Sequence, residues 1–186
     1  MGDPGTKELL SLEELDASVA LRTGRRHTLS ILVENKPGVL TRIAGLFARR
    51  GFNIDTLSVG PTDDERFSRM TLTLDGALHP IEQVTKQLHK LVNVLKIRDL
   101  EPGEAVAREL ALFKVAVDGG AQRAELMQLV EIFRGRVVDV GKRSVVVELT
   151  GTAEKVESFE AMVRPFGLVE MMRTGEIALS RGRSET

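Results

Sequence analysis

The chain has 186 residues, in which 26 lysine and arginine residues nearly balance 27 aspartate and glutamate residues, giving a net charge of -1. This balance excludes the basic surface expected of a nucleic-acid binder and the polybasic segment expected at a membrane. The chain has no cysteine and only 4% aromatic residues, which excludes disulfides, zinc ribbons, thiol catalysis and base stacking as a main activity.

The length suits two small domains behind an N-terminal extension. Residues 1–26 combine glycine, proline and mixed charges, and we expect a mobile extension able to dock as a short helix. Its apolar residues at helical spacing are Leu9, Leu12, Leu15 and Val19. No apolar run is long enough to span a membrane and no signal-peptide pattern opens the chain, so we expect a cytoplasmic protein.

The first domain opens with a change of hydrophobic period. Apolar residues alternate over residues 29–33, as in a strand, and recur at helical spacing from Val39 onward. This pattern predicts a strand, a tight turn and a helix over residues 37–50. Pro37 suits the first helical turn, and Gly51 stands where a helix C-terminal glycine is expected.

Gly38 makes the start of this helix a candidate site for a small anion. Because it has no Cβ, Gly38 leaves its own amide and that of Val39 open to a ligand. Amides at a helix N-terminus favour a carboxylate or phosphate. The same residues are also typical of an ordinary helix start with a proline in its first turn.

The remaining pattern predicts the same order of elements twice. In the first half we expect a strand over 52–59 with a bulge or bend near Asp55, a loop over 60–65, a strand over 67–74, a helix over 81–91 and a strand over 92–100. In the second half we expect a strand over 113–117, a helix over 126–133 closed by Gly135, two strands around a turn at 141–143, a helix over 156–166 ended by Pro165 to Gly167, and a strand over 168–173.

Both halves therefore predict an α+β fold of two ferredoxin-like βαββαβ domains in tandem. The expected divisions are an extension over 1–26, a first domain over 27–101, a linker over 102–107, a second domain over 108–182 and a tail over 183–186. Since this topology supports many activities, function has to be inferred from site residues.

Most catalytic and binding patterns are missing from these halves. The histidines His27, His79 and His89 share no metal-ligand spacing, and no serine or threonine is paired with a histidine for nucleophilic catalysis. The acidic run at 63–65 is more typical of a solvated loop tip than of a metal site. An acylphosphatase-like hydrolase could use Asn35, Gly38 and Arg42, although no second polar group to activate water is evident.

Several separate motifs resemble one family. Residues 34–40 (ENKPGVL) before a helix and residues 49–57 (RRGFNIDTL) resemble an ACT domain, the amino-acid-sensing module. Further stretches are similar to the regulatory (small) subunit of acetolactate synthase, also called acetohydroxyacid synthase: 61–64, 68–71, 86–91, 131–135 and 179–182. The likeness runs from about His27 to Gly182.

The resemblance implies a subunit without a catalytic centre of its own. It implies a partner catalytic subunit that carries thiamine diphosphate, FAD and magnesium, whose activity this chain raises. It also implies feedback inhibition by valine or another branched-chain amino acid, leucine or isoleucine, at an early step of branched-chain amino acid biosynthesis.

The resemblance also implies an effector site shared between two chains of a homodimer or larger assembly. Its residues would be Asn35, Gly38, Val39 and Leu40 of one chain with Asn53 and Ile54 of the next, and Thr41 close by. Helix amides would bind the effector carboxylate, asparagine oxygens its ammonium and apolar side chains its tail. The loop after the second strand is a plausible contact for the catalytic subunit, through Pro61, Thr62, Asp63, Asp64 and Arg69.

Two other functions compete with this interpretation. The stand-alone hydrolase would turn over acyl phosphates without a partner. A transcription-linked amino-acid sensor would need a helix-turn-helix or a basic recognition helix, and the sequence predicts neither.

Overall fold

The structure is a computed structural model that describes residues 26–75, 81–183 and 186. The predicted N-terminal extension lies outside the described residues, apart from Arg26, which begins the first strand. Within the described ranges, no helix is long and apolar enough to cross a membrane.

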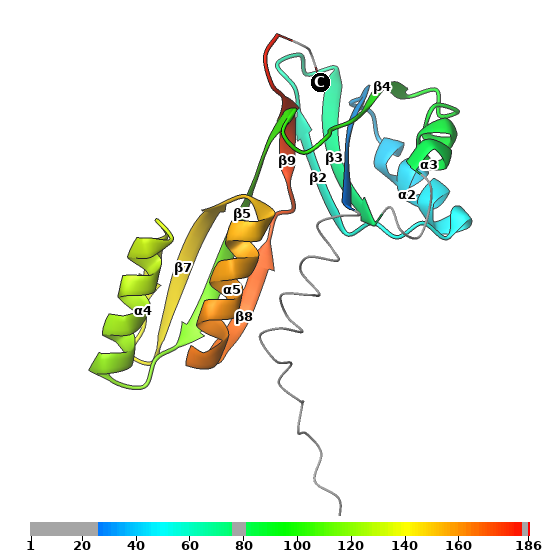
Figure 1. The fold of residues 1–186 in the computed structure, drawn as a ribbon. Helices are drawn as coiled ribbons and strands as arrows, with labels where there is room; N and C mark the ends of the chain where they lie inside the picture. The colour runs from blue at the N-terminus through cyan, green and yellow to red at the C-terminus, as the bar shows by residue number, and fades with distance from the viewer. Residues whose placement is uncertain (1–25, 76–80, 184–185) are drawn as a thin grey trace, which may run out of the picture.

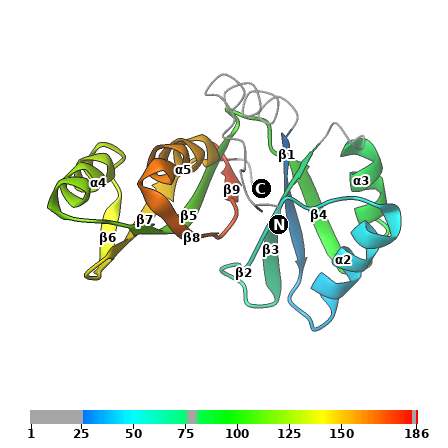
Figure 2. The ribbon, with the colours of Figure 1, turned by 90° about the horizontal axis from the view of Figure 1, so that it is seen from below.

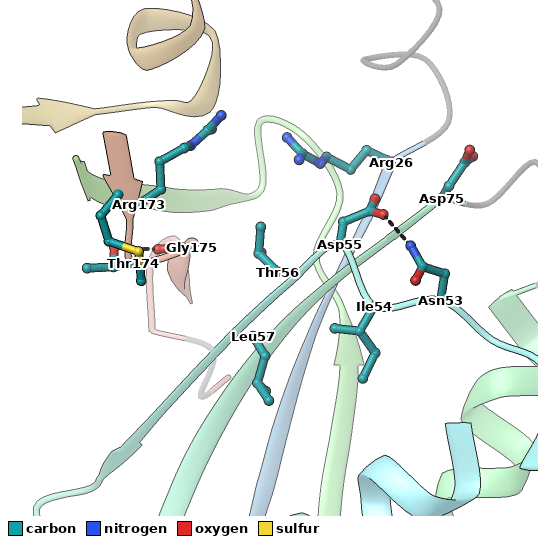
Figure 3. Close-up of a pocket in the computed structure, with 11 residues that line it drawn as sticks. Arg26, Asn53, Ile54, Asp55, Thr56, Leu57, Asp75, Arg173, Thr174 and Gly175 are labelled. Carbon is teal, nitrogen blue, oxygen red and sulfur yellow. Dashed lines mark hydrogen bonds between the residues drawn. The ribbon is translucent and has the colours of Figure 1, made fainter. Parts of the chain in front are cut away.

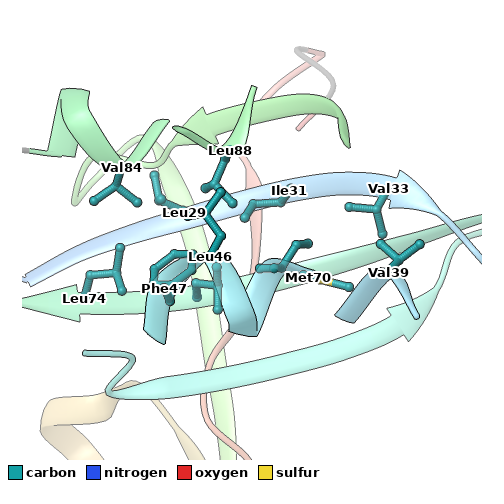
Figure 4. Close-up of a cluster of buried hydrophobic side chains, with 12 residues drawn as sticks. Leu29, Ile31, Val33, Val39, Leu46, Phe47, Met70, Leu74, Val84 and Leu88 are labelled. Carbon is teal, nitrogen blue, oxygen red and sulfur yellow. The ribbon is translucent and has the colours of Figure 1, made fainter. Parts of the chain in front are cut away.

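The first sheet is antiparallel and has the strand order β2-β3-β1-β4. Its strands are β1 (Arg26–Glu34), β2 (Thr56–Pro61), β3 (Phe67–Asp75) and β4 (Val94–Asp99), and its helices are α2 (Val39–Arg50) and α3 (Ile81–Leu88). Both helices cover the same face of the sheet (Figure 1). Figure 4 shows the core between these layers, where Leu29, Ile31 and Val33 of β1 meet Phe47 of α2 and Leu88 of α3.

The second sheet repeats this arrangement with the order β6-β7-β5-β8. Its elements are β5 (Ala105–Ala116), α4 (Gly120–Ile132), β6 (Arg136–Val140), β7 (Ser144–Gly151), α5 (Ala153–Gly167) and β8 (Leu168–Arg173). Phe159 of α5 is fully buried, and its ring contacts Phe113 of β5 and Phe133 edge-on at centroid distances of 5.0 and 5.2 Å. The two sheets with separate cores confirm the predicted pair of βαββαβ units.

The last strand of the described residues, β9 (Ile177–Ser180), was not predicted from the sequence. It pairs with residues 105–108 at the start of β5 to form a two-stranded ribbon, which we call the β5–β9 ribbon. Residues 105–107, expected in a linker, therefore belong to a strand. The later part of the same strand, residues 109–116, runs through the second sheet beside β7 and β8.

Several predicted boundaries are wrong by a few residues. The helix predicted from residue 37 begins at Val39, because Gly38 adopts a left-handed φ of 83° that ends the turn and cannot continue a helix backward. The strand predicted from residue 52 begins only at Thr56, after a bend at Asp55. Pro165 lies inside α5, and it is Gly167, with φ of 104°, that ends the helix.

Three further boundaries differ, at the end of β2, at the end of α3 and at the start of α4, which begins at Gly120 and not at residue 126. Residues 60 and 61, predicted in a loop, complete β2. The helix predicted over 81–91 ends at Leu88, and Leu91 packs against the core from the turn that follows.

A network of charged residues lies between the two sheets. The buried Glu109 carboxylate pairs with Arg173, whose guanidinium also lies 3.7 Å from Glu157. Arg26 of the first sheet reaches the same Glu157 carboxylate at 3.8 Å. Close by, Glu176 is buried, and burial is the main cause that raises the pKa of its carboxyl above the ordinary value of 4.5.

Candidate functional site

The N-terminus of α2 is built around Gly38. No side chain caps this helix, and the amide of Val39 donates to the Lys36 carbonyl at 3.3 Å. The Val39 amide, expected to be open to a ligand, is therefore engaged in the turn. The next two helical amides, of Leu40 and Thr41, precede the first i to i−4 bond, which Arg42 makes to Gly38. A helix start of this kind can bind a carboxylate.

Asn35 is fixed beside this turn by the loop between β2 and β3. Its backbone amide donates to the Arg66 carbonyl at 2.7 Å, and its side-chain nitrogen donates to the Glu65 carbonyl at 2.9 Å. These bonds engage donors of Asn35, so its side-chain oxygen remains the group that could accept from a ligand ammonium.

Asn93, a residue without a sequence signal, holds the turn against the start of β4. Asn93 donates to the Glu34 carboxylate and accepts from Arg42 Nη1 at 3.0 Å. The hydrogen bond from Asn93, followed by that from Lys36, lowers the pKa of Glu34. Asn93 lies 59 residues from Glu34 in the chain, so no local pattern could have revealed it. Arg42, the phosphate ligand of the hydrolase alternative, here positions Asn93.

Asn53 and Ile54 lie past the opposite end of α2. Asn53 donates to Asp55 at 3.2 Å (Figure 3), and Ile54 packs against the first core. Both line a pocket of about 730 Å³ whose other walls include Arg26, Asp75 and residues 172–175. Since α2 has 12 residues and rises about 1.5 Å per residue, roughly 18 Å separates this pocket from Gly38.

The predicted effector residues thus form two groups within one chain. Asn35, Gly38, Val39, Leu40 and Thr41 come together at the start of α2, with Leu40 42% exposed and Val39 buried. Asn53 and Ile54 are not part of that group. A single chain does not bring the two groups together.

The predicted catalytic-subunit contact is a loop with strong internal bonding. Thr62 Oγ1 donates to the Asp64 carbonyl at 2.9 Å and accepts from the Asp64 amide at 3.2 Å. Arg66 pairs with the Asp64 carboxylate at 2.6 Å and lowers its pKa to about 2. Arg69 donates to Ser30 and to the Thr186 carbonyl. Pro61 and Asp63 remain exposed at this loop.

No three carboxylate, imidazole or thiol groups of the described residues gather as a metal site. The groups that gather at the start of α2 are helix amides, the Asn35 side chain and the exposed Leu40 side chain. Such groups can bind and orient a small zwitterion, but none of them is an obvious proton carrier or nucleophile.

Two family models match the chain. One, described as an AHAS small subunit-like ACT domain, covers residues 29–96, and the other, described as the small subunit of acetolactate synthase, covers residues 108–182. Over 156 residues the chain is 49% identical to the "Probable acetolactate synthase small subunit" of Methanothermobacter thermautotrophicus, covering 84% of this chain and 93% of that protein. The chain belongs to the acetolactate synthase small-subunit family.

Other members of the family agree with this assignment. The acetolactate synthase small subunit of Mycobacterium leprae is also 49% identical, over 84% of this chain and 92% of its own. The crystal structure of the acetolactate synthase small subunit from Thermotoga maritima matches with a TM-score of 0.77 and 42% identity, covering 86% of this chain and 99% of that one. These matches confirm the family and the tandem ferredoxin-like fold, with an ACT domain first.

Proposed function

We propose that this chain is the regulatory subunit of an acetolactate synthase in branched-chain amino acid biosynthesis. It activates a separate catalytic subunit and makes that subunit sensitive to feedback inhibition by valine, leucine or isoleucine. The observation that carries this proposal is membership of the small-subunit family along nearly the whole described chain. The catalytic subunit is then the partner that binds thiamine diphosphate, FAD and magnesium.

The proposed effector site joins two chains. The start of α2 in one chain, with Asn35, Gly38 and Leu40, faces Asn53 and Ile54 of its neighbour in a homodimer. Free amides of the helix bind the effector carboxylate, and the exposed Leu40 side chain contacts its aliphatic tail. The two-chain arrangement is a requirement of the proposal, because the two groups lie at opposite ends of α2 and only a second copy could bring Asn53 to the helix start.

The proposal also assigns a role to each domain and to one loop. Residues 27–101 form the effector-sensing domain, and residues 108–182, extended by residues 105–107 of β5, form the second domain. The loop that contains Pro61, Thr62, Asp63, Asp64 and the neighbouring Arg69 contacts the catalytic subunit. Its internal bonds would present it as a rigid surface, with the Asp64 pair already formed.

Two measurements on the isolated chain test the proposal. Titration calorimetry with valine, leucine and isoleucine should give heat of binding for at least one of the three. Each two-chain site should bind one effector molecule. Lysine, the control, should give no heat of binding. An assay with pyruvate, thiamine diphosphate, FAD and magnesium should give no acetolactate. Turnover of acetolactate or of an acyl phosphate by this chain alone would contradict the proposal.

A further inference from the structure

A groove lies in the corner between the first sheet and the β5–β9 ribbon. Its floor is formed by β2 and β3 on the face opposite the helices, and includes Ser58, Gly60, Arg69 and Thr71. Its wall is one face of the ribbon, and the groove has a volume of about 560 Å³. Figures 1 and 2 both place β9 beside β2, between the two sheets.

The ribbon turns its large aliphatic side chains to the groove. Val106 pairs with Leu179, and Arg108 pairs with Ile177, so these four residues share one face. Val106, Ile177 and Leu179 are 40%, 64% and 57% exposed. The opposite face of the ribbon carries alanines, at positions 105, 107 and 178. The large aliphatic side chains therefore lie on one face of the ribbon, and the described residues leave them partly exposed.

Polar and charged residues form the floor and the rim, and of the two arginines there, Arg69 already donates to Ser30 and to the Thr186 carbonyl. Arg69 and Arg108 line the groove, and Asp63 is the acidic residue among its lining. Arg108 is exposed, donates to the adjacent Ala107 carbonyl, and pairs with no carboxylate of the described residues. An apolar wall beside basic side chains is complementary to an amphipathic segment that carries carboxylates.

We propose that this groove binds an amphipathic, acidic segment of the catalytic subunit. The inference rests on the proposed regulatory function and extends its contact surface from the loop at Pro61 to the ribbon of the second domain. Pro61, Thr62, Asp63 and Arg69, expected from the sequence to contact the catalytic subunit, all line the groove. The docked segment touches floor residues of the first domain and wall residues of the ribbon.

Other occupants fit the groove less well. A second copy, related by a two-fold axis, would set concave surface against concave surface and arginine against arginine. A small molecule would be surrounded on most of its surface, whereas the aliphatic wall here stays about half exposed and open.

Three variants of the full chain test the proposal by their affinity for the acetolactate synthase catalytic subunit of the same source. Ile177→Asp places a charge on the apolar wall and should weaken binding at least about tenfold. Gly60→Leu should also weaken it about tenfold, because a Cβ at Gly60 meets no atom within 4 Å and the side chain fills the groove. Arg108→Glu should weaken binding and reduce its dependence on salt.

The matched control is Val169→Asp. Val169 lies in β8 and is 62% exposed, nearly the same as Ile177, but it is outside the groove. Val169→Asp should bind the catalytic subunit with an affinity within about twofold of the wild-type value. Calorimetry with valine on each variant reports whether the first domain remains folded. Gly60→Ala fills little of the groove, so it should bind the catalytic subunit as tightly as wild type does.

The outcomes separate the two proposals. Wild-type affinity in both Ile177→Asp and Gly60→Leu would overturn the groove as the docking surface, while activation by the wild-type chain would leave the regulatory function standing. A change in sedimentation of the variants without a change in affinity would show that copies of this chain meet at the groove, and would also overturn it. Absence of wild-type binding would overturn the proposed function and this inference together.

Discussion

Gly38 is the residue on which the proposed effector site depends most. Its φ of 83° sets the tight turn before α2, and an added Cβ would meet no atom within 4 Å. Glycine is therefore favoured there by backbone conformation and not by close packing. The space next to it is open, which is what a ligand carboxylate approaching the helix amides would require.

Gly38→Asp should abolish inhibition by valine and leave activation largely intact. The new carboxylate competes for the helix amides, an interaction of roughly 0.3–1 kcal/mol, and repels the effector carboxylate. Effector coupling is typically about 1–3 kcal/mol, so the competition alone is not sufficient, and the charge repulsion and bulk of the new side chain supply the rest of the loss. The measurement is the rate of the reconstituted enzyme against valine concentration.

Gly38→Asn is the control for that variant, because asparagine has nearly the same shape, tolerates a positive φ and carries no charge. It should retain more of the inhibition than the aspartate variant. Unchanged inhibition in Gly38→Asp would place the effector elsewhere.

Glu176 gives a residue-level prediction about pH. Because burial raises its pKa in the folded protein, its contribution to stability is full below the unfolded value of 4.5 and is lost as pH rises through the folded pKa. Glu176→Gln removes this loss and can keep the hydrogen bond from Thr28, which measures 3.3 Å in the wild type. The variant should therefore gain stability relative to wild type as the pH rises above the ordinary carboxyl pKa of 4.5.

Urea unfolding at several pH values measures this difference. Glu170→Gln is a control of opposite sign, because the exposed Glu170 has its pKa lowered by Lys114. Its contribution is present above the ordinary pKa and lost as pH falls, so its removal should cost stability at neutral pH. Equal pH profiles for wild type and Glu176→Gln would contradict the assignment.

At the scale of elements, the local hydrophobic pattern predicted most of the fold. The strand and helix at residues 29–50 were evident because the period changes from two to 3.6 within a few residues. The four residues of β9 were missed, since so short a pattern carries little signal and its partner strand lies some seventy residues away, as in the pair Ala105 and Ser180. The start of α2 was misplaced because Pro37 suits a first helical turn, while the backbone conformation of Gly38 decided the boundary.

The candidate effector site could likewise be predicted from the sequence only in part. The residues around Gly38 and those at Asn53 were proposed for the site from motifs, whereas the structure shows that the two groups lie at opposite ends of α2. Asn93 and the β5–β9 ribbon could not be found, because each contributes through contacts between distant parts of the chain.

The aromatic contact of α5 gives a prediction for the second domain. Phe159→Ala should lower the free energy of unfolding by about 3–5 kcal/mol, because the ring is fully buried between Phe113 and Phe133. Met162→Ala on the same helix, at a position 49% exposed, should cost much less. Urea unfolding measures both, and similar costs for the two variants would contradict the described packing of α5.

At the scale of the whole molecule, β2 and β4 are the edge strands of the first sheet among the described residues. Exposed sheet edges favour pairing with another chain, and the proposed effector site needs residues of two chains. We therefore expect a homodimer or larger assembly. Sedimentation at micromolar concentration with valine present should show it, and a monomer under these conditions would count heavily against the two-chain site.

Reconstitution with the catalytic subunit tests the central claim most directly. The rate of acetolactate formation from pyruvate is measured for the catalytic subunit alone, after addition of this chain, and after further addition of valine, leucine or isoleucine. The account predicts that this chain raises the rate and that at least one of the three amino acids lowers it again. A rate that does not change on addition of the chain, under conditions where the catalytic subunit is active, would contradict the regulatory function.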